Sequence, residues 1–143
     1  MRLTGVRDAA DTLDAVTAAL RFLARLALCA IFVRSGIQIL RNPHPQAQRA
    51  AEALPELPEP HLVAQAQAAV QVASSAALVL DIAPRLSAGA LAATLIPVTY
   101  VGHPFWKVED PQARNQQITH FLKNLGLFGA LLLVAFPERP HAG

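Results

Sequence analysis

Positively charged and amide side chains inside apolar stretches are the residues of this sequence best suited to bind a ligand. Arg34 and Gln38 lie four residues apart near the end of one apolar stretch, so they share a face if that stretch is a helix. His120 and Lys123, with Asn124 beside them, form a second polar stripe in another apolar stretch. Cationic and amide groups together suit an anion or the carbonyl oxygen of a ligand.

Further polar residues lie at the same depth in the membrane as these if the apolar stretches are antiparallel transmembrane helices. Gln67 and Gln71 lie near the start of another stretch, and His103 and Trp106 follow the end of the next one. A charge at the bilayer centre costs about 2.5–3.5 kcal/mol on insertion scales, so each buried cation needs a compensating partner. We therefore expect a one-sided, positively lined polar pocket; the structural alternative is that these cations bond to helix-end carbonyls or reach the interface.

The apolar stretches that must position these residues are too long and too poor in charge for a soluble protein. Hydrophobic residues make up 53% of the chain and charged residues 15%, whereas about a quarter is charged in soluble proteins. Residues 61–80 and 86–106 contain no Asp, Glu, Lys or Arg, and each run has the length that a helix needs to cross a bilayer. A soluble four-helix bundle would need a charged face on each helix. The sequence therefore predicts an all-α, integral membrane four-helix bundle.

One domain over residues 19–136 is expected to hold all four spans. The spans are predicted at about residues 20–40, 61–80, 85–102 and 115–136. Residues 1–18 should form a polar interfacial segment, and residues 137–143 a short tail. Five prolines in residues 41–60 predict an extramembrane loop rather than a regular helix.

The composition also limits partners, ligands and location. Basic and acidic residues are mixed along the chain, which excludes a nucleic-acid stripe. His103 and His120 have no third ligand at a suitable spacing, so no metal site is expected, and Cys29 is expected to be a packed thiol. We expect a multi-pass protein of the cell membrane with both termini in the cytoplasm. Six basic residues lie in segments on the side of the termini and four on the opposite side, and cytoplasmic segments carry the excess of basic residues. The expected partners are the lipid bilayer and other membrane or membrane-associated redox proteins, and the sequence is compatible with a homo-oligomer.

Several motifs resemble those of the DoxX family, in particular its actinobacterial branch. They are Ser35-Gly36, Ala83-Pro84-Arg85-Leu86, Gly102-His103-Pro104-Phe105-Trp106 and His120-Phe121-Leu122-Lys123-Asn124-Leu125-Gly126. The resemblance extends over about residues 20–136. It implies a small four-helix membrane protein linked to redox systems, since the family takes its name from a subunit of a thiosulfate:quinone oxidoreductase and other members are linked to oxidative-stress defence.

Two positions depart from the family pattern. Many relatives have a lysine where this chain has Ile39, so Arg34 and Arg41 are the candidates to supply that charge. Relatives often have a paired glycine where this chain has Ala130, a change expected to affect packing only.

The leading functional hypothesis is a membrane subunit of a redox-linked system, which binds a quinone or a small anionic oxidant or reductant in the polar pocket. Arg34 and Lys123 would hold the ligand oxygen, His120 would carry a proton, and Trp106 would close the mouth. No cofactor is expected to be bound covalently, and no nucleophile with a neighbouring base specifies a reaction. The alternative is a non-catalytic accessory or assembly subunit of a larger membrane complex, whose polar half docks a partner protein or a lipid headgroup.

Overall fold

The computed structural model describes residues 3–138, and no β-strand occurs among them. The helices in chain order are α1 (Leu3–Arg41), α2 (His44–Ala53), α3 (Pro60–Val79), α4 (Pro84–Gly102), the short 3-10 helix η1 (Phe105–Lys107) and α5 (Pro111–Ala135). Of these, α1, α3, α4 and α5 are long and apolar enough to cross a membrane. The predicted all-α membrane architecture is confirmed.

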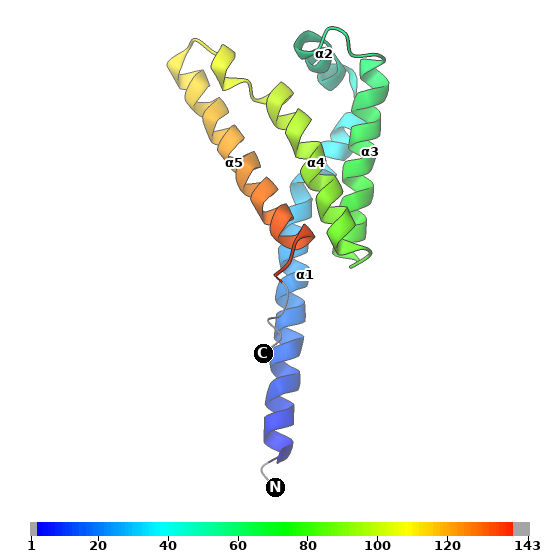
Figure 1. The fold of residues 1–143 in the computed structure, drawn as a ribbon, viewed down its shortest axis with the longest axis vertical. Helices are drawn as coiled ribbons and strands as arrows, with labels where there is room; N and C mark the ends of the chain where they lie inside the picture. The colour runs from blue at the N-terminus through cyan, green and yellow to red at the C-terminus, as the bar shows by residue number, and fades with distance from the viewer. Residues whose placement is uncertain (1–2, 139–143) are drawn as a thin grey trace.

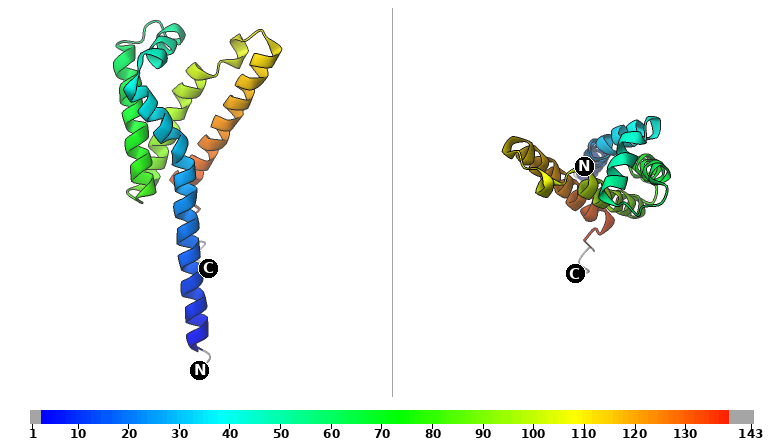
Figure 2. Two further views of the ribbon diagram at one scale, coloured as in Figure 1. Left: turned by 180° about the vertical axis from the view of Figure 1, so that it is seen from behind. Right: turned by 90° about the horizontal axis from the view of Figure 1, so that it is seen from above.

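The four long helices pack in chain order and form an open array. Helix α1 packs on α3, α3 on α4 and α4 on α5, whereas α1 and α5 make little contact. In Figures 1 and 2, α5 leans away from the other long helices toward its N-terminal end and meets them near its C-terminal end. The four helices therefore do not close into a ring, because α1 and α5 do not pack along their length.

The apolar core lies where α5 meets the other helices. Its most buried members come from all four long helices: Cys29 and Phe32 from α1, Leu78 from α3, Leu91 from α4 and Leu131 from α5. Cys29 is a buried free thiol, as expected. Further along α1, Gly36 is also buried and sits directly against the backbone of α3.

The prediction that residues 41–60 form no regular helix is wrong for half of this stretch. Helix α2 occupies it, with Pro43 at the N-cap and Pro45 in the first turn, where a missing N–H removes no helical hydrogen bond. Pro55 comes after the helix has ended at Ala53. Because α2 packs on α3 and α4, it covers that end of the array.

The N-terminal segment is continuous with the first span. Helix α1 has 39 residues, which corresponds to a length of about 58 Å at 1.5 Å per residue. The hydrocarbon core of a bilayer is only about 30 Å thick, so the first half of α1 extends beyond the other helices as a stalk (Figure 1). Of the predicted tail, residues 139–143 lie outside the part of the chain that the structure describes.

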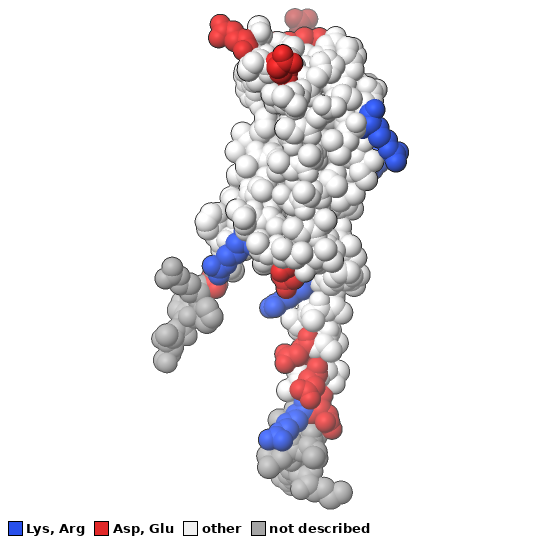
Figure 3. Space-filling model, turned by 90° about the vertical axis from the view of Figure 1, so that its right-hand side faces the viewer, with Lys and Arg blue, Asp and Glu red and all other residues white. Residues whose placement is uncertain are grey.

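The charge distribution matches a chain that crosses a bilayer. Figure 3 shows few Lys, Arg, Asp or Glu side chains across the body of the molecule, and several on the stalk of α1 and at the two ends of the body. The end of α1, both ends of α2, the start of α3, the end of α4 and the start of α5 lie at one end of the molecule. This is the arrangement of ends that four antiparallel spans require, and it brings the predicted site residues into one half of the structure.

Candidate functional site

Four aromatic side chains gather where α4 ends, η1 follows and α5 begins. The ring of Trp106 lies 5.5 Å from that of Tyr100, between centroids, and 5.1 Å from that of Phe105, which it meets edge to face. Phe105 in turn meets Phe121 of α5 edge to face at 5.3 Å. These are favourable geometries for aromatic pairs. Tyr100 and Trp106 form a wall shared by two cavities, one on each side.

The first cavity, which we call the aromatic groove, lies between α4 and α5 and has a volume of about 240 Å³. It is lined by Leu95, Ile96, Thr99, Tyr100, Trp106, Phe121, Asn124, Leu125 and Phe128. Asn124 is only 5% exposed, and its Nδ2 donates a hydrogen bond of 3.0 Å to Oγ1 of Thr99. The second amide proton of Asn124 and the hydroxyl proton of Thr99 can still be donated to a ligand. The groove is thus an apolar slot with one pair of hydrogen-bond donors.

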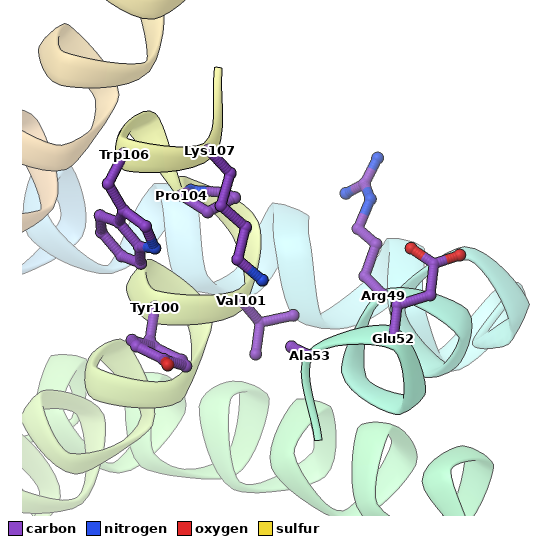
Figure 4. Close-up of a pocket in the computed structure, with 9 residues that line it drawn as sticks. Arg49, Glu52, Ala53, Tyr100, Val101, Pro104, Trp106 and Lys107 are labelled. Carbon is purple, nitrogen blue, oxygen red and sulfur yellow. The ribbon is translucent and has the colours of Figure 1, made fainter. Parts of the chain in front are cut away.

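The second cavity, which we call the α2 cavity, lies between α2 and the end of α4 and is charged. Its volume is about 250 Å³, and Arg49, Glu52 and Lys107 are among its lining residues. Figure 4 shows Arg49 and Glu52 rising from α2 on one side, with Lys107 on the other side next to Trp106. Sequence reasoning missed Arg49 and Glu52 because it treated residues 41–60 as a loop. It also left out Lys107, which lies in η1. The spacing of Arg49 and Glu52, three residues apart, would place them on one helical face.

Two histidines stack at the open end of α4 and α5. The ring centroids of His103 and His120 are 5.0 Å apart, with an angle of 18° between the rings. Nδ1 of His103 donates to Oε1 of Gln117 at 2.8 Å, which leaves Nε2 of His103 as a proton acceptor. Gln117 is a further residue that the candidate set did not include. Lys123 follows His120 by about one turn of α5, and both are exposed.

Gln67 and Gln71 lie inside the helix array rather than in either cavity. Gln71 is 2% exposed, and its Nε2 makes one long contact of 3.4 Å with Oγ1 of Thr94 in α4. Oε1 of Gln71, Nε2 of Gln67 and Oγ of Ser75 are buried without a hydrogen-bond partner. These three residues follow one face of α3 at intervals of four, so they form a buried polar line along that helix.

Arg34 and Gln38 are placed apart from the rest of the candidate set. Both are exposed on α1, where they line a cavity together with Arg41. Gln38 also lines a second cavity, with Arg49 of α2. Lys123 is on α5, which makes little contact with α1. The structure thus brings Trp106 and Asn124 together in the aromatic groove. The other candidates are divided between the stacked histidines, the interior of the array and the outer face of α1.

Metal binding finds no support in the described part of the chain, where no group of three or more His, Cys, Asp or Glu residues could hold an ion. Besides His103 and His120, one other stacked pair of histidines is formed by His44 and His61, whose ring centroids are 5.5 Å apart. This second pair lies at the starts of α2 and α3. Neither pair has an acidic or thiol ligand to complete a metal site.

Comparison with models of known protein families gives a match to DoxX over residues 20–104, more than half of the 143-residue chain. The matched segment runs from the membrane half of α1 to just beyond the end of α4. No curated protein and no solved structure matches the chain.

Proposed function

Because the chain belongs to the DoxX family, we propose that it is a membrane subunit of a redox-linked system. Members of this family are membrane proteins and are often associated with redox or stress-related systems. Within that setting, we assign to this chain the binding of a quinone or of a small anionic oxidant or reductant. The aromatic groove is the observation that carries the proposal.

A quinone headgroup fits the chemistry of the aromatic groove. Its ring is flat and apolar, so it can stack on the wall formed by Tyr100 and Trp106. A ring carbonyl can accept a hydrogen bond from the hydroxyl of Thr99 or the amide of Asn124. A volume of about 240 Å³ is below the usual range of about 300–1,000 Å³ for pockets that enclose a whole ligand. The groove therefore suits the headgroup, with the apolar tail of the quinone left in the bilayer.

The stacked histidines supply the proton chemistry that a quinone site needs. A quinone takes up protons when it accepts electrons, which in this proposal come from a partner protein. Nε2 of His103 is free to hold a proton, while the bond from its Nδ1 to Gln117 fixes the ring. His120 stacks on this ring and, being exposed, can exchange protons with water. Lys123, one turn further on, adds positive charge on the same side of α5.

The α2 cavity is suited to the other ligand class, a small anion. Arg49 and Lys107 place two cations around it, with Glu52 as the one acidic lining residue. Since Trp106 and Tyr100 line both cavities, an anion there and a quinone in the groove would be separated only by these two rings. Arg34, on the outer face of α1, takes no part in this proposal.

The test is native mass spectrometry of the full chain, extracted gently from its own membrane. We expect a bound quinone in the wild type and a loss of at least about tenfold in occupancy in Asn124→Leu, which keeps the side-chain size but removes the donor. The chain has two lysines, so one can serve as the test variant and the other as its control. Lys123→Met should weaken quinone binding, and Lys107→Met, in the α2 cavity, should not. Full occupancy in Asn124→Leu and Lys123→Met would refute the quinone site.

The accessory-subunit alternative is favoured by the stalk of α1. Leu13 and Val16 lie on it and are 68% and 51% exposed, in a part of α1 that extends beyond the other long helices. A contiguous exposed apolar patch outside the bilayer would be a docking surface. In the same experiment, a stoichiometric protein partner on a chain without a bound small molecule would favour this alternative.

A further inference from the structure

A third cavity lies at the opposite end of the array from the aromatic groove. It is lined by Arg21, Ala24, Arg25, Leu28, Pro84, Arg85, Ala130, Val134 and Pro137. Its volume is about 570 Å³, compared with about 240 Å³ for the aromatic groove. Sequence reasoning treated this half of the membrane as almost wholly apolar. The three arginines show that its edge is strongly basic, so we call this site the arginine cavity.

The arginine cavity lies where the transmembrane helices end on this side. Nη2 of Arg25 is 2.9 Å from Oδ1 of Asp81, an ion pair that ties α1 to the turn between α3 and α4. Arg85 lies in the first turn of α4, and Pro137 closely follows the end of α5. Charged side chains are seen at this level in Figure 3, where the stalk of α1 leaves the body of the molecule. The cavity therefore opens at the expected boundary between water and lipid.

The lining changes from basic to apolar with depth. Arg21, Arg25 and Leu28 follow each other at i, i+4 and i+7, so they share one face of α1. Leu28 lies about 10 Å further along the helix axis than Arg21, toward the hydrocarbon core. On the other side, Ala130 and Val134 of α5 continue the apolar wall. A molecule with an anionic head and a hydrocarbon chain would match both parts.

The positive charge of the cavity is only partly balanced by the protein. Asp81 pairs with Arg25, whereas no ion pair is found for Arg21 or Arg85 within the described residues. Among residues 3–138, the lining contains three arginines and no acidic residue. Arg85 is also at the positive end of the α4 dipole, an unfavourable place for a cation. An anion bound between Arg21 and Arg85 would relieve both effects.

We propose that the arginine cavity binds an anionic phospholipid. The guanidinium groups of Arg21 and Arg85 donate hydrogen bonds to the headgroup phosphate, which guanidinium can engage in a bidentate manner. An acyl chain packs on Leu28 and Val134. Inorganic phosphate shares the headgroup chemistry but has nothing to place on the apolar wall. The lipid is therefore the ligand that uses the whole cavity, and this inference does not depend on quinone binding.

The experiment measures lipid affinity of the delipidated full chain in detergent by native mass spectrometry. Phosphatidylglycerol is titrated in parallel with phosphatidylcholine of the same acyl chains. The variant Arg21→Gln/Arg85→Gln removes two exposed cations from the cavity, and Arg7→Gln/Arg114→Gln removes two exposed cations elsewhere. Each basic residue near a membrane surface contributes about 1 kcal/mol to binding of anionic lipid. We therefore expect phosphatidylglycerol to bind about fivefold more weakly per arginine removed, or about thirtyfold in the cavity variant, and unchanged in the control.

Three results would overturn the proposal. The first is equal affinity for phosphatidylglycerol and phosphatidylcholine in the wild type. The second is equal loss of phosphatidylglycerol affinity in the cavity variant and the control variant, which would indicate general surface charge. The third is displacement of phosphatidylglycerol by millimolar inorganic phosphate, which would make the cavity a small-anion site. Circular dichroism verifies that the variants fold; if the double variant does not, Arg85→Gln alone is used, with an expected loss of about fivefold.

Discussion

Gly36 controls how closely α1 approaches α3, the most extensive helix pair in the structure. A Cβ atom at this position would lie 2.7 Å from Cγ2 of Val72 and 3.0 Å from the carbonyl oxygen of Ala68. The methyl group of Val72 can move by a change of rotamer. The carbonyl of Ala68 cannot, because it belongs to the backbone of α3. Gly36→Ala should therefore push the two helices apart.

The expected size of this effect follows from two opposing terms. Overpacking of a tight contact costs about 1–3 kcal/mol, and replacing glycine by alanine inside a helix contributes about 1 kcal/mol in the other direction. The free energy of unfolding should thus fall by up to about 2 kcal/mol in Gly36→Ala. Gly126 in α5 is the matched control, since a Cβ atom there would meet nothing within 4 Å. Gly126→Ala should be neutral or more stable than the wild type.

Both variants can be compared by unfolding the full chain with SDS in mixed micelles. Far-UV circular dichroism follows the helices, and the fluorescence of Trp106, the single tryptophan, follows the region between α4 and α5. The reasoning fails if Gly36→Ala is as stable as Gly126→Ala, because the helices would then absorb the added methyl group without separating.

Three further predictions concern a buried amide, a strained turn and the orientation of the chain. Gln71→Leu should leave the free energy of unfolding unchanged or raised, because Oε1 of this buried amide has no partner; a loss above about 1 kcal/mol would reveal a partner such as water. Ala83→Gly should stabilise the chain by about 1 kcal/mol in the same assay, since Ala83 has the left-handed φ of 43°; no gain would contradict this. With Cys29→Ser as background, Asp8→Cys should resist an impermeant maleimide in intact cells and Glu109→Cys should react; the reverse pattern would place the termini outside.

The long spans were predictable because charge-free runs of bilayer length leave few alternatives. The span predicted at about 61–80 is α3 (Pro60–Val79), and the one predicted at about 85–102 is α4 (Pro84–Gly102). Helix α5 begins at Pro111, four residues before the start of the fourth predicted span at 115. Its start is marked by Asp110, whose Oδ2 accepts a hydrogen bond from the N–H of Ala113 as an N-cap. Proline directly after such a cap is a recognisable start signal.

The sequence predicted in which half of the membrane the candidate site residues lie better than it predicted which of them lie next to each other. Antiparallel spans place Arg34, His103 and Lys123 in one half of the structure, and chain topology alone gives that result. Which of them face each other depends on the rotation and tilt of each helix. A helix that is apolar on all sides carries little periodicity to indicate its rotation, and the divergence of α5 from α1 has no signature in the sequence. Arg34 and Lys123 consequently lie on helices that make little contact.

The divergence of α5 has a physical basis in how its two ends are held. Near its C-terminal end, Leu131 of α5 packs in the apolar core with Leu91 of α4. From its middle toward its N-terminal end, α5 is joined to α4 and the segment that follows it by two hydrogen bonds, from Asn124 to Thr99 and from His103 to Gln117. Two ring contacts add to them, His120 with His103 and Phe121 with Phe105. Hydrogen bonds between membrane helices contribute only about 0.6 kcal/mol each on average. The N-terminal half of α5, which contributes Phe121 to the aromatic groove, is therefore held to its neighbours without the packed apolar core that holds the C-terminal end.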